Sequence, residues 1–73
     1  MSTVAVIGAE AKIRGYALAG AVPLVAATET DARAQWAALP AEVVAVVLTH
    51  EAAAALAEET AAPGAPLTAV MPA

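Results

Sequence analysis

Residues 6–20 read VIGAEAKIRGYALAG, and this stretch decides how the chain begins to fold. Apolar β-branched residues run into Gly8, and a helical pattern follows that ends at Gly20. Nucleotide-binding α/β folds begin in the same way, with a buried strand that passes through glycine into a helix. The stretch therefore predicts a strand followed by a helix, joined either by a phosphate-binding loop or by a plain turn.

Four short apolar runs punctuate the chain and predict its strands. The first and third are nearly continuous in Val, Ile and Leu, which is typical of strands that are covered by helices on both faces. Prolines interrupt or flank the second and fourth runs, and because proline removes a hydrogen-bond donor these two suit the sheet edges. The predicted strands are Thr3–Ile7, Pro23–Ala26, Val43–Leu48 and Leu67–Met71.

The intervening segments are rich in alanine and carry helix-capping residues. The first helix is expected over 10–19, where Gly20 would end it in the left-handed conformation and pack closely. Thr28 or Thr30 can cap a second helix that runs to Leu39, and Thr49 can cap a third that fades at 62–66. Strands and helices thus alternate as βαβαβαβ with short connections.

This order of elements determines the predicted fold. Right-handed crossovers between parallel strands lead to one α/β domain over residues 1–73, a small doubly wound four-stranded parallel sheet with helices on both faces. The strand order 2-1-3-4 places the two most apolar strands in the centre. It also places the two proline-flanked strands at the edges.

The composition predicts a lean core. Of the 73 residues, 24 are alanine, phenylalanine is absent, and Tyr16 and Trp36 are the only aromatic residues. A domain of this size buries only about 60% of its unfolded surface, and an alanine contributes far less than the ~1.5–3 kcal/mol of a buried Leu, Ile or Val. We therefore expect marginal stability alone, and a gain in stability from a partner or from self-association.

Charge and cysteine content exclude several classes of function. The net charge is −4, and residues 34–73 carry no Lys or Arg, so the basic surface that nucleic-acid binding requires is missing. The chain has no cysteine, which excludes disulfides and thiolate metal sites. The charge-free segment 15–28 is shorter than the ~20 residues of a membrane span, so a cytoplasmic protein without direct membrane insertion is expected.

The residues around Gly8 do not match a phosphate-binding motif. A dinucleotide fingerprint needs a second glycine at position 10, where this chain has Glu10, and the Gly-Lys-Ser/Thr of a P-loop is also missing. We expect Gly8 only to turn the chain, and no ATP, NAD or other cofactor to bind. Glu10 alone would make a poor magnesium site, so no metal site is expected either.

His50 is the single histidine and follows a central strand, at the sheet edge where α/β folds usually bind ligands. A phosphohistidine or a general base is conceivable there. No plausible nucleophile–base pair accompanies it, so a solvated residue in the first turn of a helix is favoured and no catalytic residue is expected. Lys12 and Arg14 are candidates for a partner-facing surface, and Trp36 is a candidate for either the core or an interface.

Several of these residues form a pattern similar to a known family. The strand VAVIG at 4–8, the acid at Glu10 and the run GYALAG at 15–20 resemble the F subunits of V-type (archaeal and bacterial A/V-type) ATP synthases. The segments VVLTHEAAAAL at 46–56 and PLTAVMP at 66–72 are similar to the family's third and fourth strands. The positions that match the pattern are Gly8, Glu10, Gly15, Tyr16, Leu18, Gly20 and Thr49.

The resemblance implies a non-catalytic component of the central stalk, or rotor, of a V-type ATPase. Members of that family bind the coiled-coil shaft subunit, support the coupling of ATP turnover to proton or ion transport, and lie at the membrane only as part of the complex. They usually continue into a C-terminal helix, whereas this sequence stops at Ala73, so we expect either a truncated or divergent member or a globular domain that docks alone. The alternatives are a stand-alone small-ligand or phosphoryl-accepting module that uses His50, and an isolated dimerising domain.

Overall fold

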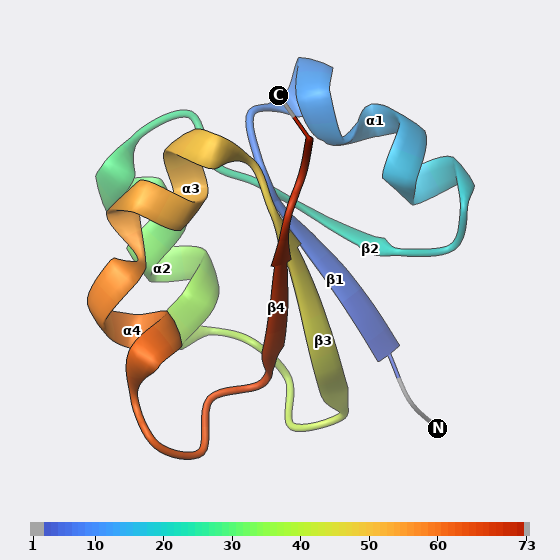
Figure 1. Ribbon diagram of the computed structural model, residues 1–73. Coiled ribbons are helices and arrows are strands. Elements are labelled where there is room, and N and C mark those ends of the chain that lie inside the picture. The colour runs from blue at the N-terminus through green and yellow to red at the C-terminus, as the bar shows by residue number, and fades with distance from the viewer. Residues whose placement is uncertain (1–2, 73) are drawn as a thin grey trace.

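The computed structural model describes residues 3–72, which form four strands and four helices (Figure 1). None of these helices is long and apolar enough to cross a membrane. In chain order, the elements are β1 (Thr3–Gly8), α1 (Glu10–Leu18), β2 (Val22–Val25), α2 (Glu29–Ala37), β3 (Val43–Leu48), α3 (His50–Ala55), α4 (Ala57–Ala61) and β4 (Leu67–Val70).

The strands form one parallel sheet in the order β2-β1-β3-β4, which confirms the predicted topology. The central β1 pairs with both neighbours, so that Ile7 lies between Leu24 of β2 and Leu48 of β3. A register shift between Thr3 and Val4 marks the start of the β1–β3 pairing. The proline-flanked β2 and β4 lie at the edges, and Pro23 falls inside β2.

Helices lie on both faces of the sheet but cover them unequally. On one face, α2 and α3 enclose the larger core, in which Ile7, Leu48 and Leu56 are fully buried. On the other face, α1 packs alone, and its buried Ile13 forms a small cluster with Val6 and Met71. Figure 1 shows α1 on the side of the sheet opposite to α2, α3 and α4.

Three predictions about the helices are wrong. The first helix ends at Leu18 rather than Ala19, which is its C-cap residue. The second helix ends at Ala37 rather than Leu39, because its last turn tightens and the N–H of Leu39 bonds to the carbonyl of Trp36 at 3.2 Å. The predicted third helix is two short helices, α3 and α4, that meet at Leu56. Leu56 adopts φ −105° and ψ 19° while its side chain is fully buried in the core.

Gly20 confirms one expectation and contradicts another. Its φ of +101° is the left-handed conformation predicted for the glycine that ends the first helical segment, one residue after the C-cap of α1. The expectation of close packing at this glycine was wrong, because no atom lies within 4 Å of the position that a Cβ would take. The glycine is needed for its backbone angles alone.

Candidate functional site

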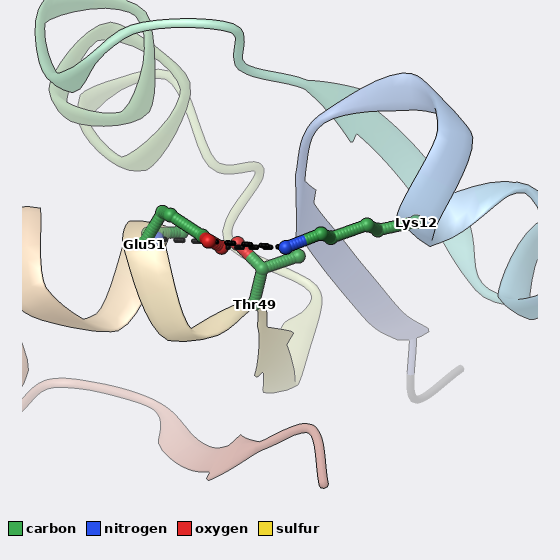
Figure 2. Close-up of polar contacts among 4 residues, drawn as sticks. Lys12, Thr49 and Glu51 are labelled. Carbon is green, nitrogen blue, oxygen red and sulfur yellow. Dashed lines mark hydrogen bonds and ion pairs between the residues drawn. The ribbon is translucent and has the colours of Figure 1, made fainter. Parts of the chain in front are cut away.

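An ion pair joins α1 to α3 at the carboxyl ends of the central strands (Figure 2). Lys12 Nζ donates to both carboxylate oxygens of Glu51, at 3.1 Å to Oε1 and 3.0 Å to Oε2. Both side chains are more than half exposed. The contact links residues 39 positions apart in the chain and bridges helices that cover opposite faces of the sheet.

The sheet topology explains this meeting. Strands β1 and β3 are neighbours, but the helices that follow them leave toward opposite faces. Such a switch point opens a crevice at the carboxyl edge, where α/β folds commonly bind ligands. Lys12 lies in the first turn of α1 and Glu51 in the first turn of α3, and their side chains point toward each other between the two helices (Figure 2).

Below the ion pair, Gly8 and Thr49 are in close contact. Both residues are buried, and a Cβ built on Gly8 would overlap Thr49 Cγ2 and lie 2.9 Å from Thr49 Oγ1 and 3.1 Å from Ile13 Cγ2. The positive-φ glycines within residues 3–72 are Gly20 and Gly64, so Gly8 has no unusual backbone angle. The prediction that Gly8 only turns the chain was therefore wrong: Gly8 ends β1 and leaves room for Thr49.

Thr49 connects the strand edge to α3, as its predicted capping role required. Its Oγ1 accepts a hydrogen bond from the N–H of Ala52 at 3.1 Å, and its own N–H donates to the carbonyl of Ile7 at 3.2 Å. Only 2% of Thr49 is exposed. This one residue thus satisfies an orphan donor of the helix and extends the contact between β3 and β1.

Two hollows lie next to Lys12. The larger, the switch-point hollow, measures about 560 Å³ and is lined by Thr49, Glu51 and several alanines of α2 and α3. The smaller measures about 320 Å³ and is lined by Tyr16, His50 and Met71 together with Thr49. Lys12 and Thr49 line both hollows.

The electrostatics of the site are those of a neutralised pair. Hydrogen bonding from the backbone of Glu51 itself, followed by the hydrogen bond and charge of Lys12, holds the pKa of the Glu51 carboxylate below its ordinary value. The carboxylate is therefore ionised at neutral pH and cancels the charge of Lys12. Within the described part of the chain, no buried side-chain oxygen or nitrogen lacks a hydrogen-bond partner.

The other predicted site residues lie apart from one another. Glu10 and Arg14 are exposed on α1, and His50 is exposed as the first residue of α3. Trp36 is partly buried and packs against the larger core, so it takes the core position of its two predicted alternatives. Between residues 3 and 72, no group of three His, Asp or Glu residues is placed to hold a metal ion.

Two positions of the resemblance pattern on α1, Gly15 and Leu18, are exposed to solvent rather than buried. Leu18 is 90% exposed, and no atom approaches the Cβ position of Gly15 within 4 Å. Tyr16, between them, is partly buried against the small cluster of Val6, Ile13 and Met71. The resemblance pattern 15–20 therefore combines one residue that packs inward with others that face solvent.

Sequence reasoning missed Glu51 as the partner of Lys12. The signal was available, because the order 2-1-3-4 places the ends of β1 and β3 side by side. Lys12 follows the end of β1 by four residues and Glu51 follows the end of β3 by three, with opposite charges. As arranged, the site joins two helices through one ion pair.

The sequence matches no family model and no curated protein, and the search of the solved structures found no match.

Proposed function

We propose that this chain is a non-catalytic component of the central stalk of a V-type ATPase or ATP synthase, similar to the F subunits of those complexes. In this role it binds the coiled-coil shaft subunit, supports the coupling of ATP turnover to proton or ion transport, and lies in the cytoplasm beside the membrane as part of the complex. The motif residues quoted above, the sheet order and a site with all its buried polar groups satisfied support this proposal.

The observation that carries the proposal is the outer face of α1. Leu18 is 90% exposed, so almost its whole apolar side chain is available for contact with a partner. Ala11 and Gly15, one helical turn apart, are also exposed, and open space surrounds the Cβ position of Gly15. Because the distance between packed helices depends on the side chains at the contact, these small residues let a shaft helix approach closely.

The three candidates for a partner-facing surface differ in whether their side chains are already engaged within the domain. Lys12 is engaged with Glu51, and Trp36 packs against the core. Arg14 is exposed next to Gly15 on α1. We therefore assign Arg14, Gly15 and Leu18 to the docking face and regard the other two as structural.

Binding to the shaft subunit encoded by the same genome tests the proposal. The wild-type chain should co-purify with that shaft protein as a 1:1 complex, and Leu18→Glu should weaken the affinity at least tenfold by calorimetry. Ala34→Glu, on the exposed side of α2, is the matched control and should bind like the wild type. Failure of the wild type to bind, or equal binding by Leu18→Glu, would overturn the assignment.

A second candidate function is a phosphoryl-accepting or small-ligand module that uses His50. The specific observation in its favour is the 320 Å³ hollow at the carboxyl edge, which His50 lines together with Lys12 and Tyr16. Incubation with acetyl phosphate followed by phosphorus NMR would reveal a phosphoramidate on the wild type and none on His50→Ala. Absence of that signal from both proteins removes the phosphoryl-accepting alternative.

A further inference from the structure

The outer edge of β4 is open and carries a defined set of backbone groups. β4 is the last strand of the sheet, and all four of its residues are exposed. The N–H of Met71 donates to the carbonyl of Leu48 at 2.8 Å, so the backbone groups of Met71 point toward β3. Because these groups alternate along a strand, those of Thr68 and Val70 point away from the sheet.

The opposite edge of the sheet is protected, whereas this one is not. On β2, the N–H of Ala26 points toward β1, where it donates to the carbonyl of Gly8, so Pro23 has its missing donor on the outer side. A proline of this kind, or a charged side chain, usually prevents an edge strand from pairing with another chain. Residues 60–73 contain no charged residue, and the prolines at 66 and 72 flank β4 without interrupting it.

We propose that a second copy of this chain adds its own β4 to this edge, antiparallel and centred on Ala69, to form a continuous eight-stranded sheet. In that register, Thr68 faces Val70 of the partner subunit, and each such pair exchanges two backbone hydrogen bonds. The two-fold axis repeats the pair, so every outward N–H and C=O of Thr68 and Val70 is satisfied. A register centred on Thr68 would instead place Val70 opposite a proline, which has no N–H to donate.

The apolar side chains fit the same register. Leu67 is 77% exposed and would lie opposite Met71 of the partner subunit, on the side of the sheet that α1 covers only partly. Ala69 would face its own copy across the axis, where a small residue allows close approach. The absence of charge from both strands means that two identical copies meet without repulsion.

The proposed interface is small, so the dimer is expected to be weak. Pairing of two four-residue strands buries less than the roughly 1,200–2,000 Å² of total area that stable interfaces bury, and interfaces below that range are weak and transient. The dimer should therefore form at high protein concentration and dissociate on dilution. This inference concerns the chain alone and does not rest on the proposed function.

Cysteine cross-linking tests the register directly, because the natural chain has no cysteine. Residues that face each other without hydrogen bonds in an antiparallel pair have Cα atoms about 4.5 Å apart, within the range that a disulfide spans. Ala69→Cys should give a disulfide-linked dimer under mild oxidation at high concentration. Ala11→Cys, at an exposed position on α1, is the matched control and should remain largely monomeric.

Sedimentation over a concentration series tests the hydrogen bonds. The wild type should rise from the 7.1 kDa monomer toward twice that mass, and Thr68→Pro should stay monomeric, since it removes an outward N–H without disturbing the bonds to β3. Thr68→Ala keeps the N–H and should dimerise like the wild type, and Leu67→Lys should block dimerisation if the proline variant does not fold. A wild type that stays monomeric at millimolar concentration, or equal cross-linking of both cysteine variants, would overturn the proposal.

Discussion

The side chain of Thr49, after β3, fits against Gly8 at the end of β1 because glycine has no side chain to occupy that space. A Cβ on Gly8 would overlap the methyl group of Thr49, between strands whose following helices leave toward opposite faces. A side chain at position 8 would therefore disturb the close packing at the carboxyl ends of β1 and β3. It also makes their substitution energies interdependent.

Gly8→Ala should lower the free energy of unfolding by about 1–3 kcal/mol, the usual cost of overpacking. The new methyl group meets Thr49 Cγ2, which belongs to a buried, hydrogen-bonded residue with little freedom to move. Thr49→Ser removes that methyl group and retains the hydroxyl, so the double variant should recover part of the loss. Urea unfolding of the four proteins measures the coupling, and strict additivity would show that the two residues do not compete for space.

The hydroxyl of Thr49 should contribute more to the stability of the domain than the hydroxyl of Thr28, although both cap a helix. Thr28 Oγ1 accepts from the N–H of Asp31 at 3.1 Å in an exposed position, whereas the bond from the N–H of Ala52 to Thr49 Oγ1 has the same length but is buried. Loss of a cap costs about 0.5–2 kcal/mol, and water can replace only the exposed one. Thermal melts should therefore show a larger destabilisation for Thr49→Val than for Thr28→Val, and equal losses would contradict this reasoning.

Two glycines of the first helical segment should respond to alanine in opposite ways. Gly15 lies inside α1 with open space around it, so Gly15→Ala should stabilise the domain by about 0.5–1 kcal/mol. Gly20 has a φ of +101°, so Gly20→Ala should destabilise it by about 1 kcal/mol through backbone strain alone. Denaturant midpoints that shift in the same direction for both variants would refute this assignment.

The ion pair between Lys12 and Glu51 should make a small contribution to stability that depends on pH. The pKa of the Glu51 carboxylate is lower in the folded chain than its ordinary value of 4.5, so this stability is present above pH 4.5 and is lost as the pH falls through the folded value. Lys12→Met should reduce the acid-induced loss without abolishing it, because the backbone hydrogen bond at Glu51 also lowers the pKa. Urea unfolding at a series of pH values below neutrality measures this loss.

The control for this ion pair is Arg14→Met on the same helix, for which no ion pair forms among residues 3–72. Its acid unfolding curve should follow that of the wild type. Because exposed pairs are screened by salt, about 1 M NaCl should bring the Lys12→Met and wild-type curves together. Curves that differ by the same amount at low and high salt would show that Lys12 acts through packing instead.

The sequence predicted the topology well because the signals were strong and independent. The β-branched runs of β1 and β3 indicated central strands, and the prolines in or beside β2 and β4 indicated edge strands. Local signals were weaker in the alanine-rich third helix. No Gly or Pro marks the break at Leu56, whose side chain is fully buried in the core and whose backbone leaves the helical angles.

The candidate site was harder to predict, since its contacts join distant parts of the chain. A glycine after a strand has the same sequence signature whether it turns the chain or admits a neighbour, and Thr49 lies 41 positions beyond Gly8. Local pattern alone could not show that the two residues touch. The Lys12–Glu51 pair could have been inferred only by first accepting the strand order and then comparing charges at adjacent strand ends.

The unequal covering of the two sheet faces has a consequence for how the native state opens. One fully buried side chain, Ile13, anchors α1, whereas α2 and α3 share the larger core. Amide hydrogens of α1 should therefore exchange with solvent through local detachment of that helix, and those of β1 and β3 only when the whole domain unfolds. A partner that holds α1 against the sheet would slow the first class of exchange and leave the second class nearly unchanged.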